Sequence, residues 1–147
     1  MAVDKSTLIK LVRQEAKNIK ENATKQEIER LKIKSLDPSN TEGCIYGQMT
    51  GNCYSERANA LIVKCATKVY KSLGTRPLDD VELSEKHTGL VKQLAVIHRD
   101  GLFHSPIEIF IYQQGYDVNF NVDRSPKGNI SRLINYLQGK TKTLTIK

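Results

Sequence analysis

Apolar side chains recur at helical spacing along most of this chain, and this spacing constrains the fold more than any other feature. The clearest stripe comprises Ala58, Leu61, Ile62, Cys65, Ala66 and Val69. Such a stripe is typical of an amphipathic helix, which buries one face against a core. We therefore expect a helix over residues 54–73, begun by Asn52 or Ser55 and ended by Gly74.

Two more helices are predicted in the N-terminal part, over about residues 6–34. One face of the first carries Leu8, Val12, Ala16 and Ile19. Thr24 and Glu27 then have the spacing of a capping box, in which each side chain accepts a hydrogen bond from the other residue's backbone amide. This pair predicts a second helix, whose apolar residues face inward. Residues 35–43 are rich in turn formers and predict a loop.

The C-terminal part, about residues 85–147, is predicted to combine helices with a small β element. Apolar spacing and end signals predict helices near residues 91–101, 105–115 and 130–139. Val118, Phe120 and Val122 alternate with polar residues, which predicts a strand, and residues 141–146 are expected to form a second. The expected fold is therefore mainly α (α+β): one compact domain, residues 1–147, with five to six helices.

A chain of 147 residues is long enough to bury a core without a disulfide or a metal. Three cysteines are an odd number, so they cannot form a complete disulfide framework. No apolar run reaches the roughly 20 residues that span a bilayer, and Lys10 and Arg13 interrupt the first apolar cluster. We expect a soluble cytoplasmic protein with reduced thiols and no membrane partner.

The net charge of +7 is concentrated at the two ends of the chain. Residues 1–35 have nine basic and five acidic side chains, and residues 113–147 have six and two, so each end carries +4. Residues 75–112 have four basic and six acidic side chains. Two basic ends around an acidic middle favour a polyanionic partner such as nucleic acid, and the alternative is a solubilising lysine-rich surface.

Aromatic and basic residues are interleaved near the C-terminus, a pattern suited to stacking bases and neutralising phosphates. The basic candidates for nucleic-acid contact are Arg124, Lys127, Arg132, Lys140 and Lys142. Tyr112, Tyr116, Phe120 and Tyr136 lie among or near them, although Phe120 equally suits a core position. No sequence signature of a known nucleic-acid-binding module is present.

Residues 44–65 hold every cysteine of the chain and allow three interpretations. In the first, Cys44, Cys53 and Cys65 bind Zn²⁺ with one histidine, His98 or else His87 or His104, because thiolates and imidazole suit a tetrahedral zinc site. In the second, the thiols are small hydrophobic core residues. In the third, Cys53 is a nucleophile at the start of a helix.

The segment between the first two cysteines also predicts a ligand-holding turn. Gly47 and Gly51 allow positive φ and leave backbone amides uncovered ahead of a helix start, where an anion is favoured. The predicted ligand-binding residues are Gly47, Gln48, Gly51, Asn52 and Arg57. Arg57 lies off the apolar stripe, so we expect its substitution to affect binding and not folding. The alternative is that both glycines simply form a turn.

These patterns assemble no catalytic set, so the expected function is that of a small, basic, non-enzymatic binding module. Proteins of this type are common among phage and mobile-element products. Its expected partner is nucleic acid, or a nucleotide or protein of nucleic-acid metabolism. The alternative is a zinc-binding or cysteine-centred protein or enzyme built on Cys44, Cys53, Cys65 and a histidine.

Overall fold

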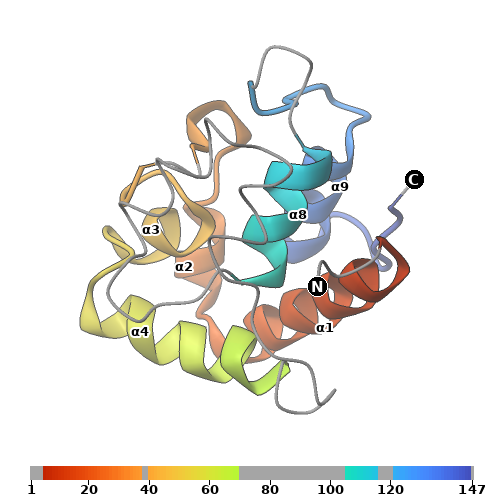
Figure 1. Cartoon of the computed structure of the whole chain (residues 1–147). Helices are drawn as coiled ribbons and strands as arrows, with labels where there is room; N and C mark the ends of the chain where they lie inside the picture. The colour runs from red at the N-terminus through yellow and green to blue at the C-terminus, as the bar shows by residue number, and fades with distance from the viewer. Residues whose placement is uncertain (1–4, 38–39, 70–104, 116–120, 147) are drawn as a thin grey trace.

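The computed structural model describes residues 5–37, 40–69, 105–115 and 121–146 of the chain. Its elements are α1 (Lys5–Asn22), α2 (Lys25–Glu29), the 3₁₀ turn η1 (Ile33–Ser35), α3 (Ile45–Thr50), α4 (Glu56–Ile62), the π-helical turn η2 (Val63–Thr67), α8 (Pro106–Gln114) and α9 (Asn129–Leu137). This part of the chain is mainly helical and compact (Figure 1). The predicted helix near residues 91–101 lies outside it.

Helix α1 is the longest described helix and packs against α8, η2 and α9. Its predicted apolar face is confirmed, since Leu8, Val12, Ala16 and Ile19 are all fully buried. Lysine and arginine side chains occupy its opposite, exposed face. One side of α1 therefore belongs to the core, and the other presents positive charge to solvent.

Helix α2 begins where the capping box predicts. The Thr24 backbone amide donates to Glu27 Oε1 at 2.8 Å, and the Glu27 amide donates to Thr24 Oγ1 at 3.1 Å. Ile28 and Leu31 are buried, as expected. The Gln138 side chain, after α9, donates to the carbonyls of both residues and so ties the C-terminal part to α2.

Helix α4 begins at the predicted cap, because Ser55 Oγ accepts from the Ala58 amide at 3.1 Å. The whole predicted apolar stripe, from Ala58 to Val69, is buried. After Ile62 the helix widens into the π-helical turn η2, a local change that frees backbone groups to bond elsewhere. Asn18 of α1 donates to the freed Cys65 carbonyl at 3.1 Å, which joins the two helices.

Helices α8 and α9 complete the core. Ser105 Oγ accepts from the Glu108 amide at 3.2 Å, and Pro106 occupies the first helical turn, as predicted. In α8, Ile107, Ile109, Phe110 and Ile111 are all buried, so this helix turns apolar side chains in several directions. In α9 the predicted residues Ile130, Leu133, Ile134 and Leu137 are buried.

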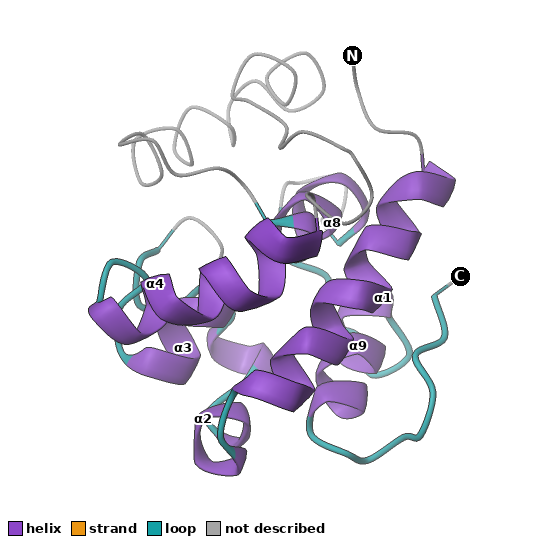
Figure 2. Ribbon diagram, turned by 90° about the horizontal axis from the view of Figure 1, so that it is seen from below, coloured by secondary structure: helices purple, strands orange, loops and turns teal. Residues whose placement is uncertain are grey.

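The predicted β element is not shown: no strand is assigned among the described residues, although Val122 of the first expected strand makes a single β-bridge. Residues 116–120 of the first expected strand are not described. The second, residues 141–146, is an irregular segment that we call the C-terminal segment. Figures 1 and 2 show it running beside α1, where the Arg13 side chain donates to the Leu144 carbonyl.

None of the described helices combines the length and apolar character that crossing a membrane requires.

Candidate functional site

The first two cysteines lie together at the two ends of α3. Cys44 caps the helix, with its sulfur accepting from the Gly47 amide at 3.3 Å. The Cys53 amide donates to the Thr41 carbonyl at 2.8 Å, which returns the chain to the start of α3. Both side chains are buried, and their sulfurs are hydrogen-bonded to each other. Cys44 and Cys53 thus form a buried thiol pair.

Hydrogen bonding and burial control the acidity of the thiols. The pKa of Cys44 is raised well above its usual value by its hydrogen bond to Cys53, by burial and by the nearby Glu108 carboxylate. The pKa of Cys53 is lowered, because its sulfur accepts the hydrogen bond from Cys44. Cys65 belongs to η2, where burial and the Glu15 carboxylate raise its pKa to about 12. Cys44 and Cys65 are therefore neutral thiols at pH 7.

The zinc hypothesis gains no support from the described residues. Among them, no three or more cysteine, histidine, aspartate or glutamate side chains are arranged to hold a metal ion. His98, the predicted fourth ligand, lies outside the described residues, as do His87 and His104. A nucleophilic Cys53 would need a base, and the three histidines that could serve as one are outside the described residues. The zinc and nucleophile interpretations therefore both stay predictions.

The prediction of a glycine turn over residues 46–52 is wrong for most of that segment, because Ile45–Thr50 is the helix α3. Gly47 lies inside this helix and serves close packing: a Cβ atom there would stand 2.1 Å from the Thr41 carbonyl oxygen. Gly51 ends the helix with φ of 97°, so the expected positive φ is confirmed there. The amides that a free loop would offer to a ligand are largely used within the helix.

The polar residues predicted to bind a ligand make hydrogen bonds within the protein. Gln48 exchanges two hydrogen bonds with the backbone of Lys32, at 2.8 and 3.1 Å. Asn52 Oδ1 accepts from the Tyr54 amide at 2.8 Å, which closes a local turn. These contacts join α3 to its neighbours along the chain, and they lend the ligand-binding prediction no support.

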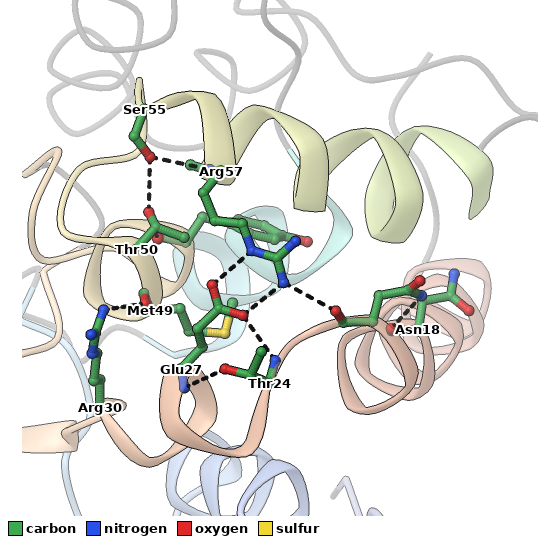
Figure 3. A network of polar contacts seen from close by, with 11 residues as sticks. Asn18, Thr24, Glu27, Arg30, Met49, Thr50, Ser55 and Arg57 are labelled. Carbon is green, nitrogen blue, oxygen red and sulfur yellow. Dashed lines mark hydrogen bonds and ion pairs between the residues drawn. The ribbon is translucent and has the colours of Figure 1, made fainter.

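Arg57 joins α4 to the junction between α1 and α2 (Figure 3). Its guanidinium donates two 2.8 Å hydrogen bonds to the Glu27 carboxylate and a third, at 3.2 Å, to the Asn22 carbonyl. These bonds lower the pKa of Glu27 to about 2. The expectation that Arg57 is independent of folding is therefore corrected: this side chain links segments 30 residues apart.

Sequence reasoning missed a buried acidic centre beside the cysteines. Glu15 is fully buried; it accepts from the Tyr46 hydroxyl at 2.5 Å and from the Ile107 amide at 2.7 Å. Burial raises the pKa of Glu15 to about 7, with these hydrogen bonds opposing the rise and the Glu108 carboxylate adding to it. Glu15 occurs on the apolar face of α1, which is the signal that would have revealed it.

The predicted basic contacts divide into structural and exposed residues. Arg124 donates to the carbonyls of Ile33 and Leu36, at 3.0 and 2.7 Å, and so holds η1 in place. Arg132 donates to Asn129 Oδ1 at 3.2 Å and lines a hollow beside the C-terminal segment. Lys127, Lys140 and Lys142 are exposed. Lys140 and Lys142 line two further hollows, described below.

The basic ends of the chain meet at a groove between α1 and the C-terminal segment. This groove, of about 420 Å³, is lined by Lys10, Arg13, Gln14, Lys17, Tyr136, Lys142, Thr143 and Leu144. Four of these residues are basic and none is acidic, so their fields add in a concave site, where positive potential is concentrated. We call this site the α1–tail groove.

The three α1 residues of the α1–tail groove were not predicted as contacts. Lys10, Arg13 and Lys17 follow the spacing i, i+3 and i+7, which places them on one face of a helix. That spacing is visible in the sequence, but it does not reveal that Lys142 lies opposite. No known protein family, curated protein or solved structure matches this chain.

Proposed function

We propose that this protein is a non-enzymatic nucleic-acid-binding module that contacts its partner through the α1–tail groove. The observation that carries the proposal is that Lys10, Arg13 and Lys17 of one basic end face the same groove as Lys142 of the other. Phosphate contacts by such side chains release counterions and supply much of the affinity for nucleic acid.

Tyr136 and Thr143 extend the chemistry of the groove beyond charge. The half-buried ring of Tyr136 lines it, and Lys20 Nζ lies 4.2 Å from the centre of that ring. Because the ring packs against the core and Lys20 lies over it, Tyr136 and Thr143 contribute their hydroxyl groups, which donate to phosphate oxygens. The three cysteines are free thiols, which agrees with a reducing cytoplasmic location for such a module.

The test is the salt dependence of binding in two matched variants. Lys10→Gln/Lys17→Gln removes two charges from the groove, and Lys64→Gln/Lys68→Gln removes two exposed charges from the helical segment after α4. Fluorescence anisotropy with labelled DNA and RNA would be measured over a salt series. We expect the groove variant to bind at least about tenfold more weakly and with a shallower salt dependence, since phosphate contacts are lost.

The control variant reports the effect of net charge alone, because both variants lose the same charge. Equal weakening of the two variants would contradict the groove as the contact surface. Absence of binding by the wild-type protein at low salt would refute nucleic-acid binding altogether.

A further inference from the structure

The α1–tail groove is the first of three hollows that adjoin one another. The second, of about 310 Å³, lies between α9 and the C-terminal segment and shares Thr143 with the first. The third, of about 470 Å³, lies between η1 and α9 and shares Asn135 with the second. A residue shared by two hollows places them side by side, so the three follow one another along a path from α1 around α9 to η1. We call this path the basic track.

Basic and hydrogen-bonding side chains line the basic track along its whole length. The second hollow adds Arg132 and the hydroxyls of Thr141 and Thr145, and the third adds Lys32, Lys34 and Lys140. Glu29 is the one acidic residue among those that line the three hollows. The track therefore offers repeated phosphate contacts to one extended polyanion, and not a single anion site.

The shape of the basic track indicates whether a single strand or a duplex fits it better. A protein that reads a duplex usually inserts a projecting helix or ribbon into the major groove. Here the basic face of α1 is flanked by the C-terminal segment, which Arg13 holds through the Leu144 carbonyl. Helix α9 lies in the floor, with Ile134 lining the third hollow. The basic groups line hollows between elements, so a flexible strand fits them better than a rigid duplex.

We infer that the basic track binds single-stranded nucleic acid along its length, with the phosphates following the lysine and arginine side chains. Proteins that bind single strands use a positively charged groove that follows the backbone, and the basic side chains of the track form such a groove. This inference rests on the proposed function, and it adds that the bound form is single-stranded and that the contact extends from Lys10 to Lys34.

The first experiment compares strand form and length. Anisotropy titrations would use labelled single strands of about 4, 8, 12 and 16 nucleotides and a duplex of the longest sequence. We expect affinity to rise with single-strand length until the track is filled, and the longest strand to bind at least about tenfold more tightly than the duplex. Equal or tighter binding of the duplex would overturn the inference and leave the proposed function standing.

The second experiment tests whether the hollows act as one path. Lys34→Gln/Lys140→Gln removes two exposed charges that line the third hollow and do not line the α1–tail groove. We expect affinity for short strands to be retained and the rise with length to stop at a shorter strand. Unchanged length dependence would overturn the continuous track. If wild-type protein binds no nucleic acid of any form, the proposed function itself fails.

Discussion

At the scale of single residues, the Arg57–Glu27 pair shows how one contact organises a junction of three helices. Glu27 accepts from Arg57 and also from the Thr24 amide, so the same carboxylate completes the α2 cap and anchors α4. The side chain of Glu27 is largely covered, whereas Arg57 is 41% exposed. A forked pair with one partly covered partner stabilises a fold more than an exposed ion pair does.

We predict that Arg57→Ala lowers the free energy of unfolding by about 1–2 kcal/mol, since it removes charge-assisted hydrogen bonds from a pair that solvent partly screens. Chemical denaturation would measure this loss, with Lys64→Ala as an exposed control. In the same variant, NMR titration should show the pKa of Glu27 rising from about 2 towards its ordinary value of 4.5. An unchanged pKa would mean that Arg57 does not hold this carboxylate in solution.

At the scale of elements, α3 depends on a close approach to the preceding turn. The Asp37 and Gly43 backbones are joined at 2.9 Å, and the Cys53 amide reaches back to Thr41. Gly47 lies against this turn, and a side chain there would meet backbone atoms, which cannot move aside as a flexible side chain can. The position of α3 therefore depends on the absence of a Cβ atom at residue 47.

We predict that Gly47→Ala destabilises the protein by about 1–3 kcal/mol, through overpacking against the Thr41 carbonyl. This is opposite in sign to the gain of about 0.5–1 kcal/mol that alanine usually brings to a helix interior. Thermal and urea unfolding would measure it. Gly51→Asn is the comparison variant: Gly51 has open space around it, so any loss of stability there comes from backbone strain at positive φ and not from a clash. If Gly47→Ala stabilised the protein, α3 would not lie against the Thr41 backbone.

At the scale of the whole molecule, the buried Glu15 carboxyl should make stability depend on pH. Its pKa is about 7 in the folded protein and near 4.5 in the unfolded chain. Between these values the folded state keeps a proton that the unfolded state releases. Glu15 therefore lowers stability progressively as pH rises from about 4.5 to 7, and its full cost, about 3 kcal/mol, is present above pH 7.

We predict that Glu15→Gln gains stability over wild type as pH rises from about 5 to 8, because the amide stays neutral and its oxygen still accepts from the Ile107 amide. Urea unfolding of both proteins across this range would measure the difference, with Glu21→Gln, an exposed change on α1, as control. Glu27 affects stability over a different pH range. Because its pKa is lowered to about 2 in the folded protein, its carboxylate stabilises the fold fully above about pH 4.5, and this stabilisation is lost as pH falls towards 2. If the free energies of unfolding of Glu15→Gln and wild type changed in parallel with pH, the raised pKa of Glu15 would be contradicted.

Local signals in the sequence indicated where helices α2, α4 and α8 begin. The Thr24–Glu27 box, the Ser55 cap and the Ser105–Pro106 start all involve groups within about four residues of one another. Interactions of this range depend on local residue identity alone. The buried faces of α1, α4 and α9 were equally visible, because helical periodicity sets which residues share a face.

Which residues the helices bring together depends on long-range packing. The sequence from Gly47 to Gly51 predicted a turn, yet the segment is helical up to Gly51 and packs closely against Thr41. Residues 141–146 read as a strand, but Arg13, 131 positions away, takes the Leu144 carbonyl. The convergence of Lys10, Arg13 and Lys17 with Lys142 has the same origin. Contacts across such separations depend on how helices pack, which local spacing does not specify.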